Sequence, residues 1–167
     1  MPLLKNGAVA ADSWHQVAGG EALPPEGPVI LPFERWRNER ETLLGRNAPL
    51  GVRLNNTQSV AELAPDLDRL EVIVLEFPKF TDGRAYSQAR LLRERYGYRH
   101  ELRAVGNVLR DQLLFMARCG FDAVEFDHAD PESAWKEGTG TFSVFYQPTG
   151  DGRTPVERRR AAGLKSV

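Results

Sequence analysis

A run of four consecutive apolar residues, Val72 to Leu75, constrains the fold of this chain more than any other feature. Three of the four are β-branched, and such an unbroken run is typical of a strand that is buried on both faces of a parallel sheet. Pro78 ends the strand, because proline has no N–H to donate to a neighbouring strand. The stretch from Leu70 to Asp127 therefore begins with a buried strand that leads into a loop.

The same stretch continues as an alternation of helices and strands. Apolar residues recur at helical spacing from Ala85 to Tyr96, with Asp82 as the expected N-cap and Gly97 as the expected end of the helix. A second helix is expected to begin at Asn107 and to end at Gly120. Consecutive βαβ units usually place their strands side by side. We therefore predict parallel neighbouring strands at 72–76, 102–105 and 122–126.

Turn and cap residues predict further elements on either side of this stretch. Asn-Gly is a strong hairpin dipeptide, and Asp-Pro-Glu is a typical helix start. The expected elements are a hairpin arm at 1–14, a strand at 29–31, a helix from Pro32 to Gly45, a strand at 51–54, a short helix from Ser59 limited by Pro65, a helix from Asp130 to about Glu137, and a last strand at 141–146.

This pattern predicts an α/β fold, with a mostly parallel sheet of about five or six strands, helices between them, and a small N-terminal hairpin. Eight βα units make a closed barrel, and this chain has too few. Two arrangements stay open: an open doubly wound sheet, or a partial barrel that completes itself as a homodimer. We expect one domain over 1–147, with 1–14 as its hairpin arm, and a mobile polar tail over 148–167.

Composition excludes several functional classes. The 41% apolar and 27% charged residues are typical of a soluble globular protein. A net charge of −1 argues against nucleic-acid binding, which favours a basic excess. No apolar run is long enough to span a bilayer, and residues 1–10 lack the apolar core of a signal peptide. We therefore expect a cytoplasmic protein that binds neither nucleic acid nor membrane.

Motifs for cofactors and metals are missing. The sequence has no phosphate-binding P-loop and no glycine-rich dinucleotide fingerprint after a strand, so no cofactor is predicted. The three histidines show no metal-ligand spacing, so no metal site is predicted. A single cysteine excludes an internal disulfide. Cys119 lies at the electronegative end of the second helix, which disfavours a reactive thiolate, and we interpret it as a buried structural residue.

Two arginines stand where the helix dipole disfavours a cation. Arg84 and Arg110 each fall in the first turn of a helix that follows a parallel strand. Both first turns should therefore meet at the carboxyl edge of the sheet, where open α/β sheets bind their ligands. One interpretation is an anion site; the other is a pair of solvated surface cations, paired with nearby carboxylates such as Asp82 and Asp111. The candidate anion-binding residues are Lys79, Thr81, Asp82, Arg84, Asn107, Arg110 and Asp111.

Three segments carry a resemblance to a known family. These are 75–93 (LEFPKFTDGRAYSQARLLR), 101–113 and 118–123. The chain resembles the bacterial domain-of-unknown-function family 934 from about Leu31 to Gln147. The resemblance implies an uncharacterised bacterial protein, often labelled a probable oxidoreductase, whose genes commonly lie beside those for assimilatory sulfite reductase and phosphosulfate reductase. The family has no agreed catalytic residues, so none is carried over.

Two functional hypotheses follow, and whether the protein is an enzyme stays open. The first is an accessory protein of sulfite assimilation that binds a sulfite reductase component, which the missing cofactor motifs favour. The second is a small enzyme or binding protein for sulfate, sulfite or phosphate at the carboxyl edge, with Asp82 or Asp111 as the candidate proton carrier. The cationic first turns favour this hypothesis. A pocket at the arginines would favour the second hypothesis, and a flat surface there with an apolar patch elsewhere the first.

Overall fold

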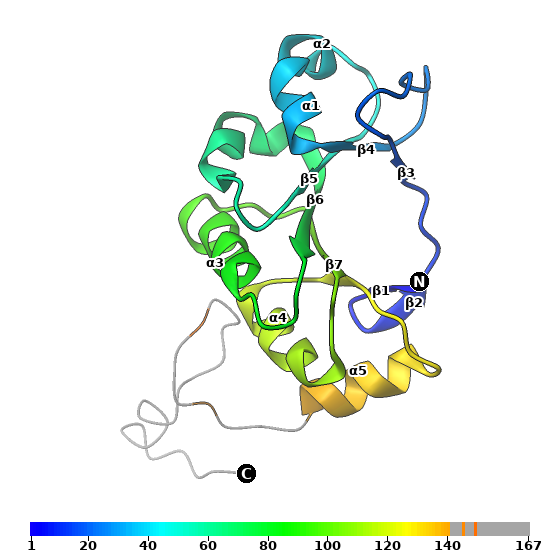
Figure 1. The fold of residues 1–167 in the computed structure, drawn as a ribbon, viewed down its shortest axis with the longest axis vertical. Coiled ribbons are helices and arrows are strands. Elements are labelled where there is room, and N and C mark those ends of the chain that lie inside the picture. Colours follow the sequence, from blue (N-terminus) through cyan, green and yellow to red (C-terminus); the bar gives the residue numbers. More distant parts are fainter. Residues whose placement is uncertain (141–144, 146–148, 150–167) are drawn as a thin grey trace.

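The computed structural model describes residues 1–140, Phe145 and Thr149, and these residues build one mixed sheet with helices along it (Figure 1). The eight strands are β1 (Leu3–Lys5), β2 (Ala8–Ala10), β3 (His15–Gln16), β4 (Val29–Pro32), β5 (Leu50–Leu54), β6 (Leu70–Phe77), β7 (Glu101–Gly106) and β8 (Ala123–Glu125). The helical elements are α1 (Phe33–Asn38), α2 (Arg40–Leu44), the 3-10 helix η1 (Val60–Arg69), α3 (Arg84–Arg90), the π-helix η2 (Leu91–Arg95), the 3-10 turn η3 (Arg110–Gln112), α4 (Leu113–Cys119) and α5 (Pro131–Gly140).

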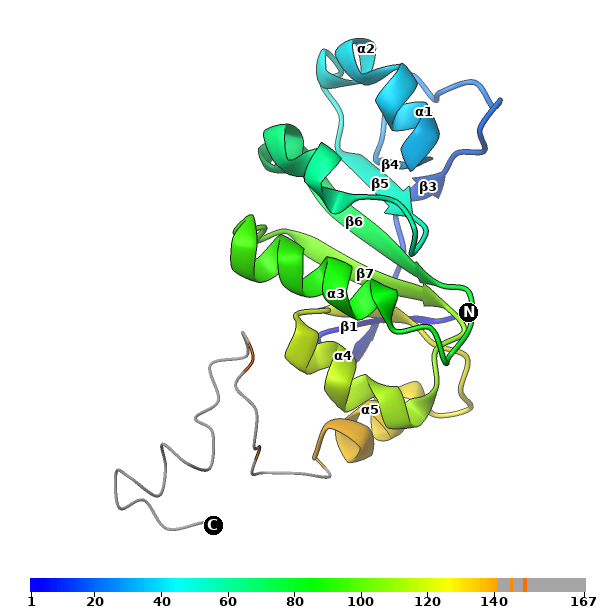
Figure 2. The ribbon, with the colours of Figure 1, turned by 60° about the vertical axis from the view of Figure 1, so that its left-hand side comes forward.

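The sheet is a curled half-barrel. Its strand order is β2-β1-β8-β7-β6-β5-β4-β3, and β3 to β8 are parallel to one another. The predicted parallel neighbours β6, β7 and β8 are therefore confirmed. Helices α1 to α4 all lie on the convex face (Figure 2). A doubly wound sheet would carry helices on both faces, so of the two predicted arrangements this sheet is the partial barrel. Its completion by a second copy of the chain stays a prediction.

The apolar run from Val72 to Leu75 is buried on both faces of the sheet, as predicted. Ile73 and Leu75 of β6 belong to the main core, which the convex-face helices cover. Val72 and Val74 point the other way, because successive side chains of a strand alternate, and they form a smaller cluster with Trp14 on the concave face. The prediction of burial was right, but a helix covers only the convex side.

The segment Ala11–Trp14 covers the concave face. It joins β2 to β3, which are consecutive in sequence but form the two opposite edges of the sheet. Figure 1 shows this segment, in blue, on the side of the sheet opposite α3 and α4. Asp12 of the segment binds Arg103 of β7, with 2.7 Å between carboxylate and guanidinium. We refer to Ala11–Trp14 as the strap.

Arg103 is the centre of a charged network beneath the strap. Its side chain is fully buried and contacts three carboxylates, those of Asp12, Glu101 and Glu125. Lys5 of β1 extends the network by binding Glu101 at 2.8 Å. A buried guanidinium is tolerated only when it is paired in this way, so the network ties the strap to β7 and β8.

The predicted hairpin is present and shorter than expected. Asn6 and Gly7 both have positive φ, 51° and 85°, as a two-residue turn of this kind requires. The hairpin spans β1 and β2, and β1 continues the sheet by pairing antiparallel with β8. Beyond Ala10 the predicted arm becomes the strap and β3.

Several helix boundaries differ from the prediction. The predicted helix from Pro32 to Gly45 is two helices, α1 and α2, and the N-cap of α3 is Gly83 instead of Asp82. Asn107 does not cap the second helix: its N–H binds the Phe77 carbonyl, and the N-cap is Leu109. Gly106, with φ 95°, turns the chain so closely over Phe77 that the helix begins only at η3. Pro65 does not shorten η1, because a 3-10 helix is a series of i→i+3 turns in which one missing N–H removes one bond.

A further difference is near the end of the described residues. Helix α5 continues through Gly138 to Gly140, three residues past the predicted end. A Cβ at Gly138 would lie 3.2 Å from the Arg110 carbonyl, so the glycine permits close packing of α5 against η3. Apart from Phe145, the predicted last strand lies outside the described residues, and so does the predicted tail apart from Thr149.

Candidate functional site

The carboxyl ends of the parallel strands form one rim of the half-barrel. Helix α1 begins at this rim directly after Pro32, and loops leave it after Leu54, Phe77, Gly106 and Glu125. In barrels of this type the catalytic and binding residues lie on such loops. Two parts of the rim differ: the loops after β6 and β7 carry the sequence-predicted residues, and the ends of β4, β5 and β6 surround a cavity.

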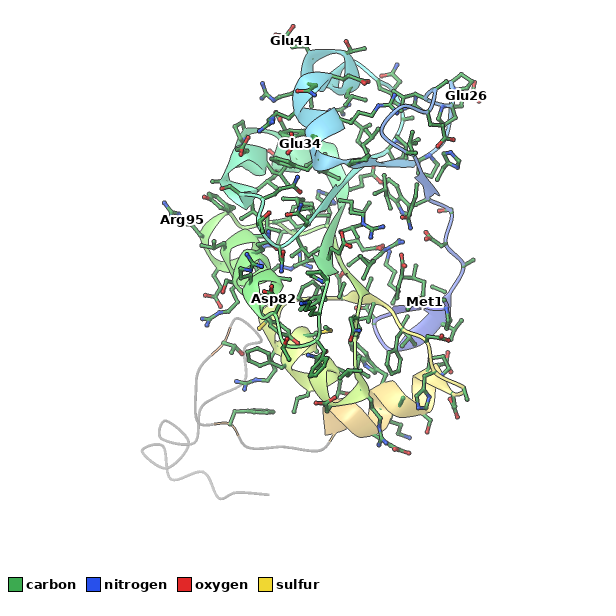
Figure 3. All side chains as sticks on the ribbon, viewed as in Figure 1. Met1, Glu26, Glu34, Glu41, Asp82 and Arg95 are labelled. Carbon is green, nitrogen blue, oxygen red and sulfur yellow. The ribbon has the colours of Figure 1, made fainter. Side chains whose placement is uncertain are left out.

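Arg84 is bound to a carboxylate two residues away. Its Nη2 and Nε donate to the two carboxylate oxygens of Asp82 at 2.6 and 2.9 Å. These hydrogen bonds lower the pKa of Asp82 to about 2. Asp82 also accepts from the Arg84 backbone N–H at 3.3 Å, although Gly83 is the N-cap of α3. Figure 3 shows Asp82 at the start of this helix. A carboxylate held so firmly ionised is a poor proton carrier at neutral pH.

Arg110 has a partner from a distant element. Its Nη2 donates to a carboxylate oxygen of Glu137 on α5, at 2.5 Å. The two arginines therefore bind different carboxylates, and more than half of each arginine side chain is exposed. The other predicted residues, Lys79, Thr81, Asn107 and Asp111, are exposed on the same two loops and on η3.

Three exposed apolar residues lie among these polar ones. Phe80, Leu109 and Phe115 are 53%, 39% and 49% exposed. The side chain of Gln112 holds the two loops together, since it donates to the Phe80 carbonyl at 2.8 Å and accepts from the Leu109 N–H at 3.1 Å. Phe115 packs edge-on against Tyr86, with ring centroids 4.6 Å apart. We call Phe80, Leu109 and Phe115 the apolar surface.

A cavity of about 420 Å³ opens at the ends of β4, β5 and β6. We call it the rim cavity. Its wall combines apolar side chains of β4 and the start of α1 with polar side chains from β3, β5, β6 and the loop after β5. The lining residues are Gln16, Val17, Ala18, Ile30, Leu31, Pro32, Phe33, Glu34, Arg53, Asn55, Gln58 and Glu76. Figure 3 shows Glu34 at the start of α1.

Arg53 and Glu76 are the charged pair on the strands of this cavity. Arg53 Nη2 lies 3.4 Å from Glu76 Oε1, and its Nη1 donates to Gln16 Oε1 at 3.2 Å. Both side chains are about one-third exposed. Sequence reasoning missed this site, although a usable pattern was present: Arg53 is the one charged residue of β5, and Glu76 interrupts the apolar residues of β6.

Cys119 and the search for metal sites and membrane-spanning helices give no further candidate site within the described residues. Cys119 is 2% exposed and belongs to the main core, as predicted. Across residues 1–140, Phe145 and Thr149, no group of three or more His, Cys, Asp or Glu side chains could hold a metal ion. In the same described part of the chain, no helix is both long and apolar enough to cross a membrane.

Comparison with known protein families gives a match. A family model described as "Bacterial protein of unknown function (DUF934)" matches residues 51–157, which is well over half of the chain. No curated protein matches the chain. The matched region contains the apolar surface together with Arg53 and Glu76 of the rim cavity, whereas β1 to β4 precede it.

Proposed function

We propose a function for this chain, which belongs to the DUF934 family of bacterial proteins. The protein is an accessory protein that binds a protein partner through the apolar surface. The resemblance to this family implies assimilatory sulfite reduction. The partner that we propose is therefore a component of sulfite reductase, met in the cytoplasm.

The exposure of Phe80, Leu109 and Phe115 is the observation that carries this proposal. Protein interfaces combine a central group of aromatic and aliphatic side chains with a polar rim, and a few aromatic residues supply most of the binding energy. Here Arg84 and Arg110 supply the polar surroundings.

Neighbouring residues support the apolar surface. Gln112 fastens the Phe80 loop to the Leu109 loop, and the ring of Tyr86 supports that of Phe115. Ordering loops on binding costs free energy, so a surface that is already ordered binds more tightly for the same contacts.

The oxyanion hypothesis stays a prediction for the same part of the rim. Arg84 and Arg110 already bind carboxylates, so a sulfate or sulfite ion would have to displace Asp82 and Glu137. If the site binds an oxyanion, sulfate should raise the melting temperature more than chloride at matched ionic strength. The double variant Arg84→Ala, Arg110→Ala should abolish that difference.

Binding of the purified full chain to purified sulfite reductase tests the main proposal. The double variant Phe80→Glu, Phe115→Glu places two charges in the apolar surface. We expect the Kd to rise at least about 30-fold, as for loss of an interface hot spot of about 2 kcal/mol. Surface plasmon resonance gives the Kd, and circular dichroism checks that the variant is folded.

Leu91→Glu is the matched control. Leu91 is 40% exposed, like the residues of the apolar surface, but it lies on η2. This variant should bind the reductase as the wild type does. Absence of wild-type binding, or equal binding by the double variant, would refute the proposal.

A further inference from the structure

The guanidinium of Arg53 is positioned but only loosely paired. Its contacts with Gln16 and Glu76 measure 3.2 and 3.4 Å, whereas hydrogen bonds between a guanidinium and a carboxylate are usually about 2.7–2.9 Å long. Arg84, by comparison, meets Asp82 at 2.6 Å. A guanidinium has five N–H donors, so Arg53 retains donors for a ligand in the rim cavity.

Glu76 brings an anionic group to the same place. Its carboxylate is about one-third exposed and lines the cavity beside Arg53. The remaining carboxylate of the cavity, Glu34, is occupied by Arg37 and by the amide of Gln58. The cavity therefore offers one cation and one carboxylate close together for recognition.

An apolar wall stands next to this pair. Pro32, at the end of β4, is half-buried and Ala18 is exposed, and both line the cavity in front of the buried side chains of Ile30 and Phe33. Phe33 is further supported by Trp36, with ring centroids 5.8 Å apart. Small-molecule sites usually combine such a wall with a few convergent polar groups, in volumes of roughly 300–1,000 Å³, and this cavity fits that description.

We propose that the rim cavity binds a small α-amino carboxylate. The ligand carboxylate accepts hydrogen bonds from Arg53, its ammonium group donates to Glu76, and its side chain contacts Ala18 and Pro32. A simple anion would be repelled by Glu76, and a simple amine would be repelled by Arg53. A zwitterion satisfies both groups at once, because its two charges are as closely spaced as theirs.

This inference does not rest on the partner proposed above. The cavity lies over β4, β5 and β6, and the apolar surface lies on the loops after β6 and β7 and on α4. Loss of partner binding and loss of ligand binding can therefore be observed separately, each with its own variants.

Calorimetry with three matched probes tests the inference on the purified full chain. L-leucine carries both charged groups, 4-methylpentanoate lacks the amino group, and 3-methylbutylamine lacks the carboxylate. We expect L-leucine to bind most tightly at millimolar concentration. Arg53→Gln should weaken binding of L-leucine and of 4-methylpentanoate at least about tenfold, as for loss of a charge-assisted contact.

Glu76→Gln separates recognition of the amino group from recognition of the carboxylate. It should weaken the binding of L-leucine by a similar factor. It should tighten the binding of 4-methylpentanoate, because the carboxylate that repels this anion is gone. Arg84→Gln, on the other part of the rim, should bind all three probes as the wild type does. No binding of any probe, equal binding of the three, or binding unaffected by Arg53→Gln would overturn the inference.

Discussion

The convex and concave faces of the sheet are built from alternate residues of the same strands, yet they are stabilised in different ways. Ile73 and Leu75 face an apolar core beneath helices, whereas Arg53, Glu76 and Arg103 point to the concave side. In a closed barrel the inward side chains of opposite strands fill the interior. A half-barrel lacks those strands, and here the strap and a set of charged pairs cover the face instead.

The charged pairs on the concave side change character toward the rim. Arg103 is fully buried and contacts three carboxylates. Arg53, at the rim, is about one-third exposed and has longer contacts. Burial makes pairing obligatory for Arg103, whereas contact with water leaves Arg53 free to exchange partners. The same face therefore provides stability at its centre and a candidate binding site at its edge.

Loss of Arg103 is the strongest test of this contrast. Arg103→Ala leaves Asp12, Glu101 and Glu125 as neighbouring carboxylates without their shared cation. We expect the free energy of unfolding to fall by about 3–5 kcal/mol, the usual cost of breaking a buried ion pair from one side. Urea denaturation measures this loss.

Arg84→Ala is the control for Arg103→Ala, because Arg84 is 58% exposed and its pair with Asp82 lies in water. It should change stability by less than about 1 kcal/mol. If the two variants were equally stable, the concave network would contribute no more than a surface ion pair, and the contrast between the faces would fail.

Gly51→Ala tests how tightly the concave face is filled beneath the strap. A Cβ at this position would lie 2.2 Å from a methyl group of Val72 and 3.0 Å from Ile30. Overpacking of this kind costs about 1–3 kcal/mol of stability, measurable by thermal or urea unfolding. Gly19→Ala is the control, since an added Cβ there meets no atom of the described chain within 4 Å. A second change, Val72→Ala, should restore part of the stability; no recovery would mean that the strain lies elsewhere.

Local patterns predicted much of the fold. The apolar run of β6, the turn at Asn6-Gly7 and the start of α5 at Pro131 each depend on a few adjacent residues, and each was confirmed. The strap was not predicted as such, because β3 has only two residues and its position depends on the curvature of the whole sheet.

The candidate site was less predictable because its contacts are long-range. The pairing of Arg84 with Asp82 spans two residues, and the sequence already offered it as one interpretation. Arg110 pairs with Glu137, which is 27 residues away. The Arg53 contacts depend on which strands are neighbours and in which register, since Arg53 lies opposite Val74 of β6. A sequence alone does not specify that register.

The smallest expected effect concerns a polar group within the convex core. Tyr98 is 2% exposed, and its hydroxyl donates to the carbonyls of Leu70 and Glu101. Burial raises the pKa of Tyr98 above its usual value. Tyr98→Phe keeps the ring but loses these hydrogen bonds, so at pH 8 it should lower the free energy of unfolding by about 1 kcal/mol. Urea unfolding at pH 8 measures the difference.

The same variant should show a different dependence on alkaline pH. Above the ordinary tyrosine pKa of about 10, the unfolded wild type releases the Tyr98 proton while the folded protein retains it. The folded state then binds more protons, so wild-type stability falls by about 1.4 kcal/mol per pH unit from this group. Burial also raises the pKa of Tyr86, to about 12, but Tyr86 contributes equally to both proteins. The difference between wild type and Tyr98→Phe should therefore shrink from about 1 kcal/mol at pH 8, reach zero between pH 10 and 11, and change sign by about pH 11. A difference that stays constant over this range would show that Tyr98 ionises as readily in the folded protein as in the unfolded chain. The main core on the convex face would then tolerate a charge, contrary to the proposed difference between the two faces.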